Sequence, residues 1–227
     1  MAGIGMVSAV SGPAAAGGAA TMSTPIPQWW DVPGRTCVAA YMPRGAANQA
    51  ASYIDLTGNG NDCILGIAPA WDPVNGWDST AGGGPWLDTQ VVWTLTWTII
   101  VRFSNILNTA AYTFGCDNGA ATNRLGYVTT LASARGYFNG ASGAVLVAPP
   151  ISGVVAIADR SGYLNGALDT AAIGAGVVPV PTVAFMGVHR GAGVVAAQQV
   201  MIQAAAIYSA TLTAPEIAAL TVVVAAL

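Results

Sequence analysis

Hydrophobic and polar side chains alternate in the middle of the chain with the period of a β-strand. Over residues 91–103 the small or polar positions are mostly threonines, and the large side chains occupy every second position: Trp93, Leu95, Trp97, Ile99, Val101 and Phe103. A helix would repeat every 3.6 residues, so this pattern favours a strand. We predict one long strand over residues 91–103, with its large side chains facing a core between two sheets.

The dipeptide Asn-Gly, which tolerates the positive φ angles of tight hairpin turns, occurs five times. The pairs begin at Asn59, Asn75, Asn118, Asn139 and Asn165, and the last three are spaced as in a meander of hairpins. Apolar runs between the turns predict strands at 124–130, 134–138, 144–147, 154–159, 163–164, 183–188 and 200–208.

The segment Leu212–Leu220 has the pattern of a helix. Thr213 can cap its N-terminus, Pro215 suits the first turn, and Glu216 follows Thr213 by three residues, as in a capping box. Together these elements predict an all-β fold, a two-sheet antiparallel jelly-roll β-sandwich with a short C-terminal helix.

Five short motifs, in order, resemble those of the LamG-like, concanavalin A-like lectin-glucanase jelly-roll domains. The loop Asp55–Asp62 is similar to their D-x-S-G-N-G-N-x turn, and 97–103 resembles their F-T-I-S-x-W-x strand, with Phe103 in place of the usual Trp. Further along, 161–166, 185–187 and 207–220 resemble the later hairpin, strand and helix. The resemblance covers about residues 38–222 and implies the fold. It does not imply one function, since such domains serve as glycan binders, adhesin modules, enzyme accessories and phage virion parts.

The composition is unusual in its small number of charged residues. The 227 residues include only 7% charged residues, seven Arg and no Lys, with a net charge of −3 and a mean hydropathy of +0.56. This excludes charge-rich disorder and a basic nucleic-acid binder. Two stretches, one on each side of Arg190, contain no charged residue. The first is interrupted by Gly and Pro, and the second has Gln198, Gln199 and Gln203 in its middle, which are costly in a bilayer. We therefore expect no membrane span.

The first 28 residues, Met1–Gln28, have no periodicity and are rich in Ala, Gly, Ser and Thr. We therefore expect two regions, an extended N-terminal arm (1–28) and one sandwich domain (29–227) that ends in the apolar tail Thr221–Leu227. We expect no cleaved signal peptide, because no Lys or Arg precedes Arg35.

The cysteines and the histidine do not form a recognisable metal or catalytic motif. Cys37, Cys63 and Cys116 have no CxxC spacing and no metal-ligand spacing to His189, the only histidine. We expect three reduced thiols, with one disulfide and a leftover thiol as the alternative.

Enzymatic activity is not expected. A glycosidase needs two suitably spaced carboxylates, and the single glutamate, Glu216, is better explained as a helix cap. Gly-x-Ser-x-Gly is absent, so His189 is interpreted as a polar residue at a strand end or loop.

Two binding sites are candidates. Asp55, Asn59, Asn61 and Asp62 alternate with glycines and could supply oxygen ligands to calcium, although Gly66 stands where an EF-hand has its glutamate. The alternative, which we favour, is an Asx-turn that satisfies its own backbone. Sugar rings stack on aromatic faces beside carboxylates, and the glycan-binding candidates are Trp71, Trp77 and Trp86, with Asp72, Asp78 and Asp88 nearby. The favoured alternative is that these tryptophans belong to the core.

Two functions follow. The sparse charge and apolar tail favour a structural protein of a symmetric assembly, most concretely a phage virion component of the capsid-decoration or fibre type, whose partners are its own copies and neighbouring structural proteins. The alternative is a lectin-like glycan-binding module of a secreted or cell-surface protein.

Overall fold

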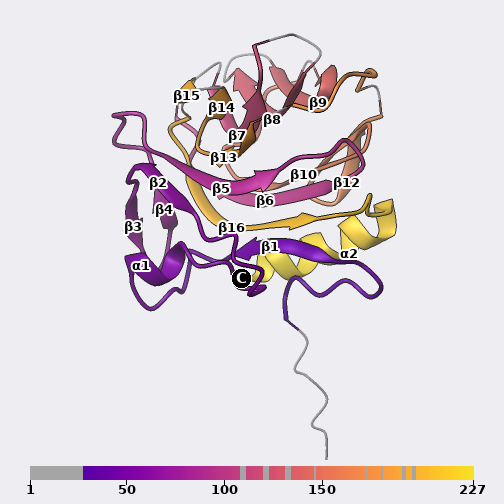
Figure 1. Ribbon diagram of the computed structural model, residues 1–227. Coiled ribbons are helices and arrows are strands. Elements are labelled where there is room, and N and C mark those ends of the chain that lie inside the picture. Colours follow the sequence, from indigo (N-terminus) through magenta and orange to yellow (C-terminus); the bar gives the residue numbers. More distant parts are fainter. Residues whose placement is uncertain are drawn as a thin grey trace, which may run out of the picture.

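The computed structural model describes residues 28–107, 111–119, 123–130, 134–145, 147–171, 173–179, 181–190, 193–195 and 198–227. Two β-sheets lie face to face, and a helix covers the outer side of one of them (Figure 1). The predicted antiparallel β-sandwich with one C-terminal helix is therefore confirmed. Of the predicted arm Met1–Gln28, only Gln28 lies within the described residues.

The first sheet, here called the β6 sheet, has eight strands in the order β12-β11-β10-β6-β16-β4-β3, with β1 paired to β16. Its strands are β1 (Cys37–Tyr41), β3 (Ala70–Asp72), β4 (Gly76–Asp78), β6 (Thr98–Ser104), β10 (Gly153–Ala158), β11 (Ser161–Leu164), β12 (Ala167–Thr170) and β16 (Met201–Tyr208).

The second sheet, here called the β7 sheet, also has eight strands, in the order β15-β14-β7-β13-β5-β2, with β8 paired to β7 and β9 to β8. Its strands are β2 (Ile64–Ile67), β5 (Trp86–Val92), β7 (Ala111–Asp117), β8 (Arg124–Thr130), β9 (Ala134–Val145), β13 (Thr182–Phe185), β14 (Val188–Arg190) and β15 (Gly193–Val195). The β14–β7 pair is parallel, whereas the other described pairs are antiparallel. A short helix, α1 (Gln49–Ser52), lies between β1 and β2 in the chain.

The core between the sheets is built from the inward side chains of both. It includes Trp77, Phe103, Phe114, Tyr127 and Phe185, all at most 1% exposed. Since successive strand residues point to opposite faces, the residues that alternate with the inward ones in the β7 sheet lie on its outer face.

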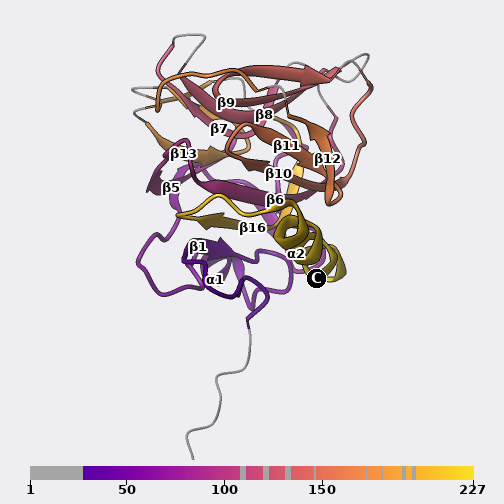
Figure 2. The ribbon, with the colours of Figure 1, turned by 90° about the vertical axis from the view of Figure 1, so that its right-hand side faces the viewer.

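Helix α2 (Ala214–Ala226) packs on the outer side of the β6 sheet (Figure 2). Ile217, Leu220 and Val224 bury one side of the helix against Ile100 and Tyr208. The predicted capping box is present at Thr213 and Glu216. The helix continues through most of the apolar tail Thr221–Leu227 and ends at Ala226. No helix in the described part of the chain is long and apolar enough to cross a membrane.

The strand predicted over residues 91–103 is wrong, because it is two strands in different sheets. β5 ends at Val92, the chain turns where the Trp97 amide donates to the Thr94 carbonyl (3.2 Å), and β6 begins at Thr98 in the other sheet. Both strands face the same core, so the large side chains keep their alternation across the turn.

The Asn-Gly turns are confirmed only in part. Asn165 and Gly166 have φ of 50° and 79° and join β11 to β12 as predicted. Asn139 and Gly140, in contrast, lie inside β9, so this predicted hairpin is wrong. The Asn139 side chain is buried and accepts a hydrogen bond from the Trp93 indole (2.8 Å), a tertiary contact that a sequence pattern does not reveal.

Candidate functional site

A row of paired residues crosses the outer face of the β7 sheet. Asp88 pairs with Ala184, Ala184 with Gly115, Gly115 with Gly126, and Gly126 with Phe138. Four strand spacings of about 4.8 Å make this row roughly 19 Å long. Its middle positions, Ala184, Gly115 and Gly126, have minimal side chains and are buried, whereas Asp88 and Phe138 at its ends are partly exposed.

Two glycines allow aromatic rings to lie flat on this face. A Cβ built at Gly66 would stand 1.8 Å from Cε2 of Trp86, so the Trp86 ring lies directly over β2. A Cβ at Gly126 would stand 2.7 Å from the Tyr112 ring, which covers β8 in the same way. Trp86 is partly exposed, whereas Tyr112 is 8% exposed.

Polar side chains surround Trp86 at one end of the row. The His189 ring lies 6.1 Å from the Trp86 ring, between centroids, at an interplanar angle of 32°. His189 Nδ1 is 2.9 Å from Thr182 Oγ1 and 3.9 Å from Asp88 Oδ2. Asp88 Oδ1 also accepts the Gln90 backbone N–H, which fixes the carboxylate. An aromatic platform, a carboxylate and an imidazole thus meet in one place.

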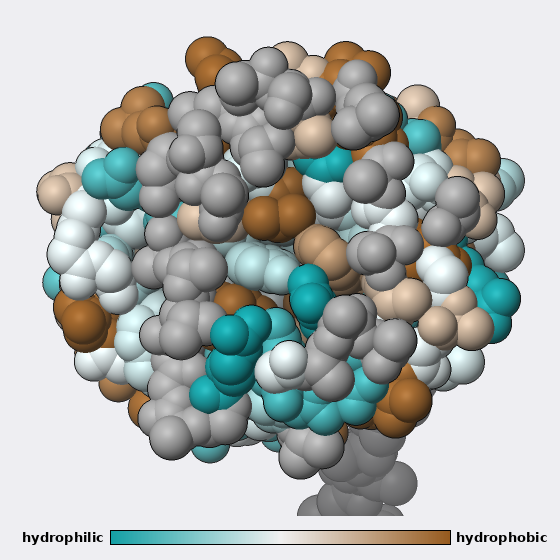
Figure 3. Space-filling view, turned by 90° about the horizontal axis from the view of Figure 1, so that it is seen from above, coloured by the Kyte–Doolittle hydropathy of each residue, from teal (hydrophilic) through white to brown (hydrophobic). Residues whose placement is uncertain are grey.

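Charged groups gather around Asp117, at the end of β7. Its carboxylate is fully buried and lies 2.6 Å from Arg190 Nη2 and 3.9 Å from Arg124 Nε. The Arg124 guanidinium lies over the Phe138 ring, 5.3 Å from its centroid. Figure 3, which looks down on this side of the molecule, shows hydrophilic side chains around the middle of the view.

The ionisation of these groups follows from their contacts. The hydrogen bond to Asp117 raises the pKa of Arg190 above its ordinary value. Burial raises the pKa of Tyr112, and the nearby Arg124 opposes that rise only in part. Arg190 is therefore a fixed cation and Tyr112 a neutral hydroxyl at ordinary pH.

The arrangement does not form a catalytic relay. A triad needs a histidine that holds a carboxylate through one ring nitrogen and a hydroxyl through the other. Here both Thr182 and Asp88 face the same nitrogen, Nδ1 of His189. What these groups can do is hydrogen-bond a polar ligand that stacks on Trp86. The site therefore has groups that can bind a polar ligand.

The structure separates the glycan-binding residues predicted from the sequence. Trp86 and Asp88 lie together on the outer face of the β7 sheet, whereas Trp71, Trp77 and Asp78 belong to β3 and β4 of the other sheet. Trp77 is fully buried, its indole donates to Ser52 Oγ (2.8 Å), and its ring stacks on Tyr53. It is closed to a sugar ring, and its burial agrees with the favoured alternative, in which these tryptophans belong to the core.

The other three residues of that group have local roles. The Trp71 indole donates to the Pro43 carbonyl (2.8 Å), and its ring packs against the core. Asp78 Oδ1 accepts hydrogen bonds from the amide (2.7 Å) and hydroxyl (2.6 Å) of Thr80. Asp72 accepts from the turn residues Val74 and Asn75. For these residues the geometry agrees with the alternative of packing and turn formation.

In the loop Asp55–Asp62, for which calcium binding was predicted, the polar side chains form hydrogen bonds with the protein itself. Asp55, 3% exposed, accepts hydrogen bonds from the amide of Ala40 (3.0 Å) and from the amide (3.0 Å) and hydroxyl (2.8 Å) of Thr57. Asp62 Oδ1 accepts the Asp55 amide (2.8 Å), while the side-chain amides of Asn59 and Asn61 donate to the Val38 carbonyl. Within the described ranges, no three His, Cys, Asp or Glu side chains are grouped to hold a metal. The geometry has the features of the Asx-turn, and calcium stays a prediction.

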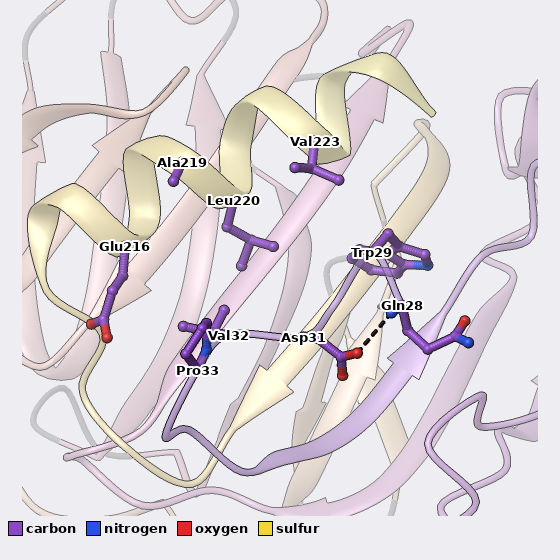
Figure 4. Close-up of a pocket in the computed structure, with 9 residues that line it drawn as sticks. All are labelled: Gln28, Trp29, Asp31, Val32, Pro33, Glu216, Ala219, Leu220 and Val223. Atoms are coloured by element: carbon purple, nitrogen blue, oxygen red, sulfur yellow. Dashed lines mark hydrogen bonds between the residues drawn. The ribbon is translucent and has the colours of Figure 1, made fainter. Parts of the chain in front are cut away.

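A groove of about 400 Å³ lies between α2 and the segment before β1 (Figure 4). Its walls are mainly apolar, with Leu220 and Val223 of the helix facing Trp29 and Val32. Glu216, at one end, is bound by Arg35, and Asp31 Oδ2 accepts the Gln28 amide (2.7 Å). The groove therefore offers a sugar fewer polar partners than the β7 sheet does.

The sequence alone did not indicate most of the polar and aromatic residues on this face. Tyr112, Asp117, Arg124, Phe138, Thr182 and Arg190 were not singled out. They come from five strands that are distant in sequence, and only strand pairing brings them together. One local signal was present: Arg124 alternates with the inward residues Leu125 and Tyr127, which marks it as outward-facing.

The sequence matches no protein-family model and no curated protein. Solved structures do match. Trypanosoma rangeli sialidase in complex with sialic acid is similar at a TM-score of 0.56 and 16% identity, over 84% of this chain and 33% of that one. Domain 4 of AbnA, a GH43 extracellular arabinanase from Geobacillus stearothermophilus, in complex with arabinotriose, is similar at 0.53 and 14%, over 82% and 98%.

These similarities concern the β-sandwich. The chain spans about a third of the length of the sialidases and nearly the whole of the AbnA domain. At such low identity they show the fold alone, a β-sandwich that also occurs as a domain of carbohydrate-active enzymes.

Proposed function

We propose that this protein is a non-enzymatic glycan-binding module whose ligand lies on the outer face of the β7 sheet. The observation that carries the proposal is the Trp86 ring, flat over Gly66 and partly exposed, with Asp88 and His189 beside it. The apolar face of a sugar ring stacks on such a platform, and its hydroxyls donate to a carboxylate and bond to an imidazole.

Further polar and aromatic groups of the same face would add to the site. Asp117, itself buried, holds the Arg190 guanidinium at 2.6 Å, so this donor is pre-positioned toward a ligand. At the opposite end of the row from Asp88, Phe138 offers a second ring.

The fold comparisons support this function over a virion role. The similar AbnA domain and the similar sialidase are both recorded with a saccharide, whereas neither is a phage protein. The LamG-like resemblance is also compatible with it. We infer an extracellular or cell-surface setting, and the virion and capsid interpretation has no support from these similarities.

A glycan array followed by titration tests the proposal. We expect at least one glycan to be retained, and Trp86→Ala and Asp88→Asn each to weaken its affinity at least tenfold. Trp71→Phe is the matched control, because Trp71 lies on the other sheet, and it should bind as the wild type does. An array without a ligand, or variants with unchanged affinity, would refute the function.

Self-association is the second candidate, favoured by one observation. β2 is an edge strand with Ile64, Leu65 and Ile67 45–54% exposed, and such an edge is a template for another strand. Light scattering on a sizing column, with the full chain and with residues 1–28 removed, tests it. A concentration-independent monomer in both cases would contradict the candidate.

A further inference from the structure

A second, polar pocket of about 330 Å³ lies where the C-terminal end of α2 meets the outer side of the β6 sheet. It is on the opposite sheet from the proposed glycan site and does not depend on it. The polar residues that line it are Arg102 and Ser104 of β6, Ser152 before β10, Asn165 of the β11–β12 turn, and Gln203 of β16. No carboxylate is among the described residues that line it.

Arg102 lines this pocket, and the charge of a second arginine, Arg44, acts on it. Arg44 donates its backbone N–H to the carbonyl of Gln203 (3.3 Å), which lines the pocket, and its charge acts on Arg102. Within the described chain, neither guanidinium lies within 4.0 Å of a carboxylate, whereas Arg35, Arg124, Arg135 and Arg190 each do. Burial and the neighbouring Arg44 both lower the pKa of Arg102, which reflects the unfavourable placement of this charge.

The helix end satisfies Arg102 only in part. Arg102 Nη1 donates to the Val224 carbonyl at 3.2 Å, a bond that closes the last turn of α2. A guanidinium has five N–H donors, so one carbonyl does not exhaust it. Asn165 uses its carbonyl oxygen to accept the Val154 amide (2.9 Å), so its NH₂ group remains as a donor.

We propose that this pocket binds a tetrahedral oxyanion, a sulfate or phosphate group, either free or carried on a sugar. The cation of Arg102, with Arg44 behind it, would hold the charge. The hydroxyls of Ser104 and Ser152 and the amides of Asn165 and Gln203 would bond to the oxygens.

Calorimetric titration with sodium sulfate at constant ionic strength, using the full chain, tests the site. We expect saturable binding that Arg102→Gln and Arg44→Gln each weaken at least tenfold. Arg160→Gln is the matched control, because Arg160 is an exposed arginine in the β10–β11 turn and its loss changes the net charge equally. It should leave the affinity unchanged.

Two further measurements make the result decisive. Arg102→Gln also removes the bond to α2, so circular dichroism checks the helix, and Arg44→Gln tests the pocket without touching that bond. Amide NMR shifts on adding sulfate should centre on Ser104 and Gly153. No saturable binding, or an equal loss in all three variants, overturns the proposal.

Titrations with inorganic sulfate, glucose 6-sulfate and glucose distinguish a free oxyanion from one that is carried on a sugar. Equal affinity for the first two indicates a free anion, and tighter binding of the sulfated sugar indicates a carried one. Both outcomes support the oxyanion site, whereas glucose binding as tightly as glucose 6-sulfate overturns it.

Discussion

Arg35 and Glu216, 181 residues apart in the sequence, form a two-pronged ion pair. Arg35 Nε lies 2.8 Å from Glu216 Oε1, and Nη2 lies 3.1 Å from Oε2. The same carboxylate accepts the Thr213 amide (2.7 Å) at the N-cap of α2. The Glu216 side chain therefore connects the N-terminus of α2 to the segment that precedes β1.

This pair predicts a pH-dependent stability. The hydrogen bond from Arg35 lowers the pKa of Glu216 to about 2 from 4.5. Because the folded pKa is below the unfolded one, the stabilisation is complete above pH 4.5 and is lost as the pH falls toward 2. Glu216→Gln should cost about 1 kcal/mol at pH 7, and its difference from the wild type should shrink over that window. Denaturant unfolding at several pH values measures this, with Asp159→Asn as the control. A constant difference down to pH 2 would argue against the ion pair.

The two tryptophans Trp77 and Trp86 should respond oppositely to truncation. Trp77→Ala opens a cavity in the core and removes the indole bond to Ser52, and we expect a loss of about 4 kcal/mol in unfolding free energy. Trp86→Ala should cost about 1 kcal/mol, because the ring is partly exposed. Urea unfolding of both variants provides the comparison, and similar losses would place the Trp86 ring in the core instead.

The Asp55 loop should be stabilising whether or not calcium is present. Asp55→Ala leaves the buried amide of Ala40 and the partly buried amide of Thr57 without their acceptor, so we expect a loss of about 3 kcal/mol in unfolding free energy. The melting temperature of the wild type should be the same with millimolar calcium and with a chelator. A calcium-dependent rise that Asp55→Ala abolishes would instead establish the cation site.

Gly66 should control glycan binding without contacting the ligand. Gly66→Ala places a Cβ where the Trp86 ring lies, so the ring must leave β2. We expect at least a tenfold loss of affinity with little loss of stability, because β2 is an edge strand. Leu65→Ala on the same strand is the control and should bind normally. Unchanged affinity in Gly66→Ala would show that the ring position is unimportant.

Local patterns predicted those elements whose determinants are themselves local. The capping box at Thr213 predicted the start of α2, and an apolar run between turns predicted β8 at residues 124–130. The failures came from long-range contacts. Alternation continued across the turn at Thr94–Trp97 because two sheets share one core, and Asn139 is held inside β9 by Trp93.

Only part of the candidate site could be predicted from the sequence, because long-range contacts assemble the rest. Trp86 and Asp88 are two residues apart on β5, so a search for aromatics near carboxylates found them. Arg190 and Asp117 meet because β14 pairs with β7 in parallel, and no spacing along the chain indicates that pairing.

The pairing of β1 with β16 joins the two ends of the sandwich, with Ala40 opposite Ala206 and Tyr41 opposite Ala205. Synthesis on the ribosome is sequential, so β1 stays unpaired until β16 has been translated. Until then the Tyr41 side chain and the β6 strand lack part of their cover. We therefore expect this long-range pairing to form late and to slow the folding of the sandwich.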